Sequence, residues 1–227
     1  MCGRYTLTSP SEDLALLFDI SEQLPLIPPR YNLAPTQEAA VVRITAPGEP
    51  RRLDFLRWGL IPYWAKEASI GNRMINARSE GVAEKPSYRH SFKKKRCLVP
   101  TDGFYEWKKE GKAKQPFLIR RHDHKPFAFA GLWSTWRDPE KGVPVETFTI
   151  LTTDANDFIR PLHDRMPVIL QREDFDLWLD PKIEDAERLQ ALLHPAPNDI
   201  LETFPVSKLV NSPTNELPNC IEPLVEG

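Results

Sequence analysis

Short runs rich in β-branched and aromatic residues fill the middle of the chain, and Gly, Pro and charged turn segments separate them. This pattern is typical of β-strands. The runs Ala39–Ile44 and Leu53–Trp58 flank the turn Pro47-Gly48-Glu49-Pro50, which predicts a hairpin. Further strands are expected at Cys97–Val99, Phe104–Lys108, Phe117–Arg121, Phe127–Leu132, Thr147–Thr153 and Val168–Leu170.

Helical periodicity is confined to short segments. Ser9-Pro10-Ser11-Glu12 has the residue types of a capping box with proline at the first helical position, and it predicts a helix running to about Ile20. Asp154 is placed to cap a short helix toward Arg160. Short helices are also expected within residues 79–95, 172–179 and 184–193. Residues 24–36 are interpreted as a proline-rich loop, and the last 30 residues as irregular.

These elements together predict an α+β fold with a central, curved and mostly antiparallel β-sheet and peripheral helices. A chain of 227 residues is long enough for a sizeable core and falls near the upper end of one domain. It contains neither an internal repeat nor a composition shift that marks a linker, so we expect a single domain over residues 1–227. The 23 prolines and only 10 glycines favour rigid turns over long helices.

Composition and charge exclude several classes of protein. A net charge of -2 with 27% charged residues excludes a disordered tail or a strongly charged scaffold. A sequence pI of about 6.2 gives no global basic field, so any nucleic-acid binding must come from local patches. No apolar run approaches the ~18 residues that span a bilayer. Without an export signal, the three cysteines (Cys2, Cys97 and Cys220) favour a reducing, cytoplasmic location.

Motifs for metals and cofactors are missing from the sequence. It has no phosphate-binding glycine loop, no dinucleotide fingerprint, no C-x-x-C and no H-E-x-x-H. His122 and His124 lie two positions apart in a polar turn, but the further ligands of a metal site are lacking. We therefore expect neither a metal nor a cofactor.

Cys2 directly follows Met1, and a small second residue permits removal of the initiator methionine. A terminal cysteine carries a thiol and an α-amine on adjacent carbons, with ordinary pKa values of about 8.5 and about 8. Such an aminothiol can condense with an aldehyde to a thiazolidine, or attack an amide as an N-terminal nucleophile. The plain alternative is a small residue that merely allows Met1 to be removed. Arg4 nearby would bind phosphate or lower the thiol pKa, or would be an ordinary surface arginine.

Three further polar residues stand in apolar surroundings. Asn76, in Met-Ile-Asn-Ala-Arg, would orient a thiol or a sugar hydroxyl, or would cap a turn. Glu106, in Phe-Tyr-Glu-Trp, would be a desolvated carboxyl with a raised pKa, or would face solvent from an edge strand. His163, beside Asp and Arg in a loop, would act as an acid or base, or would be a structural histidine. No spacing rule brings the four residues together.

Several blocks together resemble the SOS-response-associated peptidase (SRAP) family. They are MCGRY at the start, YNLAP at 31–35, WGLIPYWA at 58–65, MINARSE at 74–80, GFYEW at 103–107 and LHDRMPVIL at 162–170, in family order over nearly the whole chain. The resemblance implies a compact α+β domain around a barrel-like sheet. It also implies a DNA damage response protein that binds single-stranded DNA and crosslinks to abasic sites through its terminal cysteine. The family name reflects a proposed autoproteolytic activity.

The resemblance carries roles onto individual residues. It implies that Cys2 is the nucleophile, that Asn76 positions the cysteine and the sugar, that Glu106 moves protons in Schiff-base chemistry, and that His163 helps to open the sugar and to reverse the bond. The implied DNA contacts are phosphate contacts from Arg4 and Arg78, contacts to flanking bases from Trp64 and the Asn32–Pro35 loop, and a weaker contact from Thr152. The expected partner is single-stranded DNA with abasic sites. The protein is expected to be a monomer and not to associate with a membrane.

Two other functions remain open at this point. One is a cysteine peptidase that acts on other proteins, and the other is a non-covalent module for modified bases. Two basic segments would support DNA binding or would simply be solvated charged surface. They are Arg89–Arg96 and the group Lys108, Lys109, Lys112 and Lys114.

Overall fold

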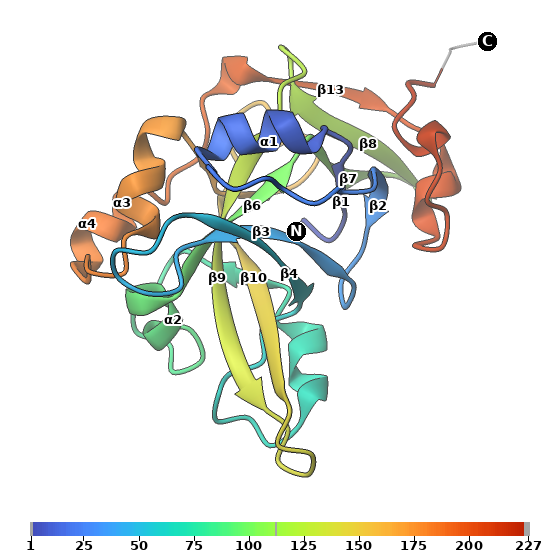
Figure 1. Ribbon diagram of the computed structural model, residues 1–227. Coiled ribbons are helices and arrows are strands. Elements are labelled where there is room, and N and C mark those ends of the chain that lie inside the picture. Colours follow the sequence, from blue (N-terminus) through green and yellow to red (C-terminus); the bar gives the residue numbers. More distant parts are fainter. Residues whose placement is uncertain (1, 112, 225–227) are drawn as a thin grey trace.

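A closed ring of five β-strands forms the centre of the computed structural model, which describes residues 2–111 and 113–224 (Figure 1). The strands of the ring are β3 (Glu38–Arg43), β4 (Arg52–Trp58), β6 (Arg96–Thr101), β9 (Phe127–Arg137) and β10 (Pro144–Asp154). The pairing runs β10-β4-β3-β6-β9, and a further pairing of β9 with β10 closes the barrel. Within the ring, β4 and β10 run parallel, whereas the other neighbours are antiparallel.

A second, antiparallel sheet of five strands lies against the barrel. Its order is β13 (Leu201–Pro205), β8 (Ala113–Arg121), β7 (Gly103–Glu110), β1 (Tyr5–Leu7) and β2 (Arg30–Leu33). Three short strands extend the barrel sheet, namely β5 (Asn76–Arg78), β11 (Arg165–Pro167) and β12 (Ile169–Leu170). β5 and β11 both pair with β10, which brings residues 76–78 beside the segment that follows β10.

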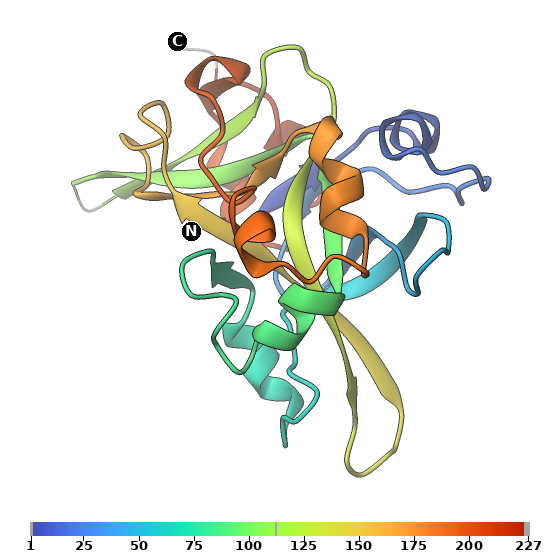
Figure 2. The same cartoon turned by 90° about the vertical axis from the view of Figure 1, so that its left-hand side faces the viewer.

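The helices are short and lie on the periphery (Figures 1 and 2). The α-helices are α1 (Ser11–Phe18), α2 (Arg89–Lys94), α3 (Phe175–Leu179) and α4 (Ala186–Gln190). The 3-10 turns are η1 (Ala68–Arg73), η2 (Arg172–Asp174), η3 (Asn198–Ile200), η4 (Lys208–Asn211) and η5 (Pro218–Cys220). α1 is fastened to α3 by the stacked rings of Phe18 and Phe175, whose centroids are 5.6 Å apart.

Aromatic side chains join the N-terminal strand to the barrel. The wholly buried ring of Tyr5 meets Trp58 edge-on at 5.1 Å and Phe129 at 6.1 Å between centroids. Phe129 also contacts Phe104 of β7 at 5.7 Å. Edge-to-face aromatic pairs contribute about 0.5–1.5 kcal/mol each beyond the area that they bury. This packing holds β1, and with it residues 2–4, in a fixed place between the two sheets.

The α+β class, the barrel-like sheet and the β3–β4 hairpin are confirmed. The capping box is wrong, because the residue preceding α1 is Pro10 and no side chain caps the helix. Ser9 instead hydrogen-bonds with Asp102, which accepts from its backbone N–H at 2.9 Å and from its hydroxyl. The carboxylate of Asp102, which lies between β6 and β7, therefore binds the serine that the local sequence assigns to the helix cap.

The predicted helix from Asp154 to Arg160 is also wrong. Asp154 ends β10, and its Oδ1 accepts a hydrogen bond of 2.6 Å from Arg165 Nη1, so it is not available as a cap. The residues that follow form turns rather than a helix. Residues 24–36 are not all loop, because they contain β2. The last 30 residues are not all irregular, because they contain β13.

Met1, Lys112 and residues 225–227 lie outside the described residues, so the expected removal of Met1 and the contribution of Lys112 stay predictions. Along the described chain, no helix combines the length and the apolar character needed to cross a membrane.

Candidate functional site

Cys2 lies at the start of the chain with its backbone fixed by Asn76. The Asn76 side chain donates from Nδ2 to the carbonyl oxygen of Cys2 at 2.7 Å. Asn76 belongs to β5, which runs parallel to β10 in the register Ile150 to Asn76. The Asn76 Oδ1 atom is buried and has no hydrogen-bond partner among the described residues. One amide thus anchors the cysteine with its donor and keeps an acceptor in the same buried space.

The Cys2 side chain is wholly buried. Burial, followed by the negative charge of Glu106, raises the pKa of its thiol, so the thiol form is favoured. Its Sγ lies 3.8 Å from the carbonyl oxygen of Arg4. A thiol in this state needs a proton acceptor before it can act as a nucleophile.

Glu106 lies in β7 with only 3% of its surface exposed. Side chains alternate across a strand, so Glu106 shares the face of Phe104, which points into the core, rather than that of Tyr105. Burial raises the pKa of the Glu106 carboxyl, and the charge of His163 opposes that rise. The predicted desolvation of this carboxyl is confirmed. Glu106 interacts electrostatically with both Cys2 and His163, which brings three of the four candidate residues into one region.

His163 lies in the loop between β10 and β11, and its ring has a defined orientation. Nδ1 accepts a hydrogen bond of 2.9 Å from the backbone N–H of Arg165. In the neutral ring the proton therefore resides on Nε2. Nδ1 also lies 3.0 Å from Asp164 Oδ1, which would pair with the protonated ring.

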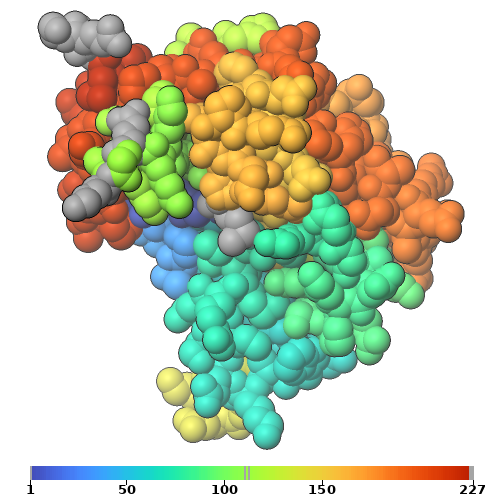
Figure 3. Space-filling view, turned by 180° about the vertical axis from the view of Figure 1, so that it is seen from behind, coloured from blue at the N-terminus to red at the C-terminus, as the bar shows by residue number. Residues whose placement is uncertain are grey.

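A cavity of about 560 Å³ lies between the end of β7 and the loop that carries His163. Glu106, Trp107 and His163 line it, together with Lys108, Lys109, Lys114, Pro161, Leu162 and Asp164. Figure 3 shows how the green β7–β8 hairpin, the yellow-orange loop after β10 and the teal segment that includes β5 surround one part of the surface. The cavity joins the buried carboxyl of Glu106 and the partly exposed ring of His163 to a rim with three lysines.

Arg4 and Asn32 contact one another. Arg4 Nη1 donates to Asn32 Oδ1 and to the carbonyl oxygen of Val210, both at 2.7 Å. Burial lowers the pKa of the half-buried Arg4 guanidinium. Asn32 is wholly buried, and its Nδ2 donates to carbonyl oxygens within residues 210–215. Asn32 therefore presents its amide to the protein rather than to solvent, and the sequence-based expectation of a direct base contact finds no support in its placement.

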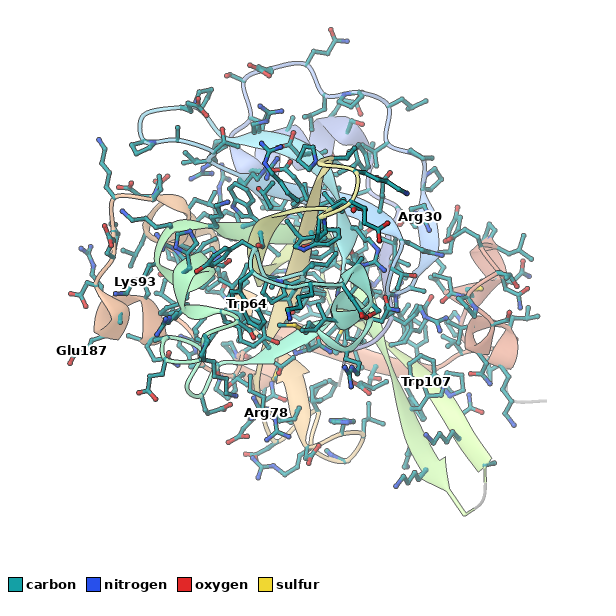
Figure 4. The ribbon with its side chains drawn as sticks, turned by 90° about the horizontal axis from the view of Figure 1, so that it is seen from below. Arg30, Trp64, Arg78, Lys93, Trp107 and Glu187 are labelled. Atoms are coloured by element: carbon teal, nitrogen blue, oxygen red, sulfur yellow. The ribbon has the colours of Figure 1, made fainter. Side chains whose placement is uncertain are left out.

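The other expected DNA contacts differ in exposure. Arg78 is exposed at the end of β5, two residues after Asn76, so both side chains leave the same face of that strand. Trp64 is 49% exposed, and Pro35 is half-buried. Thr152 is wholly buried, and no described residue partners its hydroxyl. Figure 4 shows Trp64, Arg78 and Trp107 distributed over one face of the molecule.

Trp107 is a residue that the sequence analysis missed as part of the site. It lines the cavity beside Glu106, and its Nε1 donates to Asn211 Oδ1 at 2.7 Å. The Arg4 guanidinium lies 5.9 Å from the centre of its ring. In the sequence, Trp107 looks like an ordinary member of an apolar strand. Its position directly after the candidate residue Glu106 is the signal that could have identified it.

The basic segment Arg89–Arg96 does not form one cationic face. Arg96 is 2% exposed and donates to five carbonyl oxygens, among them those of Trp178 and Asp180. Lys94 pairs with Glu184, and the Lys95 ammonium lies 4.5 Å from the ring centre of Trp133. In Figure 4, Lys93 and Trp107 lie on opposite sides of Trp64. Lys108, Lys109 and Lys114 remain as the basic group at the cavity.

Within residues 2–111 and 113–224, no group of three or more His, Cys, Asp or Glu side chains is placed to hold a metal ion. The candidate reactive groups of the site are a thiol, an amide, a carboxyl and an imidazole. Such a set can form a covalent bond to an electrophilic carbon and move the protons that the bond requires.

Comparison with known proteins gives consistent relationships. The sequence is 48% identical over 225 residues to the abasic site processing protein YoqW of Bacillus subtilis, covering 98% of this chain and 99% of that one. It is 34% identical to the abasic site processing protein YedK of Escherichia coli, over 99% of this chain and 100% of that one. It is 33% identical to the abasic site processing protein HMCES of Gallus gallus, over 88% of this chain and 67% of that one.

A crystal structure of a protein from Bacteroides thetaiotaomicron superposes with a TM-score of 0.88 at 26% identity, covering 99% of this chain and 100% of that one. The family profile described as SOS response associated peptidase (SRAP) matches residues 1–213. Because this match covers most of the chain, and the relatives from Bacillus subtilis and Escherichia coli align over nearly their full lengths, the chain belongs to the SRAP family.

Proposed function

We propose that this protein processes abasic sites in DNA by forming a covalent thiazolidine between Cys2 and the ring-opened aldehyde of the lesion in single-stranded DNA. One observation carries the proposal: the buried carboxyl of Glu106 interacts electrostatically with both Cys2 and His163, and it lines one cavity together with His163. The relatives named as abasic site processing proteins support the choice of substrate.

The chemistry begins with removal of Met1, which places an α-amine and a thiol on Cys2. An abasic sugar equilibrates between a closed hemiacetal and an open aldehyde. The protonated Nε2 of His163 and the carboxyl of Glu106 are suited to the proton transfers of ring opening, at about 10²–10⁴-fold each. The open form presents an electrophilic carbon to the aminothiol.

The covalent steps balance with the loss of one water molecule. The Cys2 amine adds to the aldehyde carbon, and the resulting carbinolamine loses hydroxide as water to leave an imine. The thiol sulfur then adds to the imine carbon and closes a five-membered ring. The proton of the thiol moves to the ring nitrogen. Glu106, whose carboxyl pKa is raised by burial, is the relay that we assign to these transfers. The product no longer has an aldehyde to drive strand breakage by elimination.

Binding of the strand is assigned to the cationic surroundings of the cavity. The exposed guanidinium of Arg78 and the lysines of the β7–β8 hairpin are suited to phosphate groups, and the exposed ring of Trp64 is suited to stacking on a base. An abasic gap needs no base to be displaced, so a small residue such as Cys2 can enter without an unstacking cost. A DNA substrate accords with the cytoplasmic location expected from the sequence, and it implies association with the nucleoid when the protein is bound to DNA.

The burial of Cys2 speaks against a general cysteine peptidase. Such enzymes lower the pKa of the nucleophilic thiol, whereas burial raises it here. Cleavage confined to the residue ahead of Cys2 remains compatible with the proposal, since it would produce the required amine.

The proposal is tested by incubating the protein with single-stranded DNA that carries one abasic site and measuring the intact mass of the product. The expected adduct has the sum of both masses minus one water and survives denaturation. Cys2→Ala keeps the α-amine, so it should give only an imine that borohydride traps, whereas Cys97→Ala is the matched control and should behave as wild type. A heat-stable adduct from Cys2→Ala would refute the proposal.

A further inference from the structure

The C-terminal strap, defined as residues 206–224, forms a loop whose two ends meet, and it packs against the second sheet (Figure 1). Val206 and Pro223 form an isolated antiparallel bridge, and the backbone N–H of Leu224 donates to Pro205 at 2.9 Å. Val206, Val210 and Cys220 form a small buried cluster with Tyr105 and Leu118 of the sheet. The strap is thus a built part of the fold, joined to the same strands that carry Glu106.

Asn32 connects the strap to Arg4. Its Nδ2 donates to the carbonyl oxygens of Ser212 and Asn215 at 2.9 and 2.8 Å, and its Oδ1 accepts from Arg4 Nη1 at 2.7 Å. The strap itself supplies the second acceptor for Nη1, the carbonyl oxygen of Val210 at 2.7 Å. Arg4 is therefore held by one residue of β2 and one of the strap.

Glu216 fastens the strap to β2. Its Oε1 accepts from the backbone N–H groups of Tyr31 and Asn32 at 2.6 and 2.7 Å. Its Oε2 accepts from Arg30 Nε and Nη2 at 3.1 and 2.9 Å. Hydrogen bonds to a carboxylate are about twice as strong as those between neutral groups. The family profile ends at residue 213, so Glu216 lies beyond the span that it matches.

We infer that the strap is a positioning device for DNA binding, in which Glu216 and Asn32 hold the Arg4 guanidinium toward the phosphate backbone of the bound strand. Among the described residues, Nη1 has hydrogen-bond partners, whereas Nε is buried without one, so we assign Nη2 to a phosphate oxygen. A guanidinium that is already oriented loses less side-chain freedom when it binds. The inference rests on the proposed function, because the strand is the partner that Arg4 would meet.

The test compares Asn32→Ala and Glu216→Gln with Arg4→Ala. Glu202→Gln is the matched control, because Glu202 also pairs with an arginine, and its side chain is 37% exposed against 31% for Glu216. Affinity is measured with single-stranded DNA carrying a tetrahydrofuran abasic analogue, which cannot react, over a series of salt concentrations. The rate at saturating reactive DNA is measured separately.

Asn32→Ala and Glu216→Gln should each weaken binding by about 5-fold and reduce the log–log salt slope by about 0.7, as Arg4→Ala does. In the Arg4→Ala background they should add no further change in slope. The rate at saturating DNA should stay that of wild type, and Glu202→Gln should match wild type throughout. A merely structural role would lower the melting temperature and leave the salt slope unchanged.

A second measurement needs no DNA and covers a variant that folds poorly. The nitrogen resonances of the Arg4 guanidinium should show restricted rotation in wild type and in Glu202→Gln, and lose it in Glu216→Gln. The positioning role is overturned if Arg4→Ala lowers the affinity and the salt slope while Asn32→Ala and Glu216→Gln leave both unchanged. It is also overturned if the Arg4 resonances are unaffected in Glu216→Gln. A wild-type protein that forms no adduct overturns the proposed function instead, and the resonances still decide whether the strap holds Arg4.

Discussion

The side chain of Asn76 holds the carbonyl oxygen of Cys2 through a hydrogen bond of 2.7 Å. The two residues are 74 positions apart in the chain. β5 carries the amide to the N-terminus because it pairs in parallel with β10. A nucleophile at a chain terminus would otherwise be mobile, so this bond is a means of fixing its geometry before the aldehyde arrives.

Removing this anchor should slow the reaction without weakening DNA binding. Asn76→Ala deletes both the donor to Cys2 and the buried acceptor, and misplacement of a reacting group by about 1 Å costs about 10²-fold in rate. Single-turnover crosslinking at saturating DNA checks the prediction, with affinity for the unreactive analogue as the control. An unchanged rate would show that Cys2 needs no such anchor.

Glu106→Gln keeps the shape of the side chain and removes its titratable proton. Crosslinking should slow by about 10²-fold or more, because the relay between the amine, the thiol and the leaving water is lost. Binding of the unreactive analogue should be unaffected. Equal single-turnover rates for wild type and Glu106→Gln would remove the acid–base role.

The same substitution should make the protein more stable at neutral pH. Burial raises the pKa of Glu106 in the folded state above its unfolded value. The folded state therefore binds more protons, and the free energy of unfolding falls as the pH rises from the unfolded to the folded pKa. Glu106→Gln does not lose stability in this way. At pH values above the folded pKa its melting temperature should therefore exceed that of wild type, and at pH values below the unfolded pKa the two melting temperatures should approach one another. A melting difference that does not vary with pH would contradict the raised pKa.

His163 should act on proton transfer at Nε2, since its Nδ1 accepts from the Arg165 backbone. His163→Ala should slow both sugar opening and reversal of the adduct by about 10²-fold, because both steps need the same proton in opposite directions. Release of DNA from purified adduct, followed on a denaturing gel, measures reversal. If reversal in His163→Ala keeps the wild-type rate, another group moves that proton.

Arg78 should contribute through phosphate alone. Each phosphate contact on a single strand contributes about 0.7 to the log–log salt slope. Arg78→Ala should therefore weaken binding alike for different sequences and flatten the slope by that amount, whereas Lys93→Ala, away from the cavity, serves as the control. A loss that depends on sequence at an unchanged slope would indicate base contacts instead.

Several parts of the fold were readable from local pattern. The β3–β4 hairpin has two strand-like runs on either side of a Pro-Gly turn, and the strand around Glu106 is long and aromatic. Glu106 itself stood out because a carboxylate in an apolar strand must be either exposed or desolvated. These features depend on neighbours in sequence.

Other parts depend on partners far along the chain. β1 and β5 have three residues each, too few for a periodic signal, and they exist because β7 and β10 pair with them. The polar Asn32 resembled a surface contact, but its amide is taken up by Arg4 and by the strap, whose segment gave no pattern at all. The convergence of Cys2, Asn76, Glu106 and His163 is likewise a product of topology rather than of spacing.

The α-amine of Cys2 separates the proposed chemistry from ordinary cysteine catalysis. A thiol alone gives a reversible hemithioacetal with an aldehyde, whereas the thiazolidine needs both nucleophiles on one residue. The most direct test is the intact mass of the product from abasic single-stranded DNA, comparing the native start with a non-removable N-terminal tag. The tagged protein should give no denaturation-resistant adduct although its thiol is untouched, and a C-terminal tag should leave the yield unchanged. Equal adduct from a protein whose mass shows a blocked terminus would contradict the aminothiol mechanism.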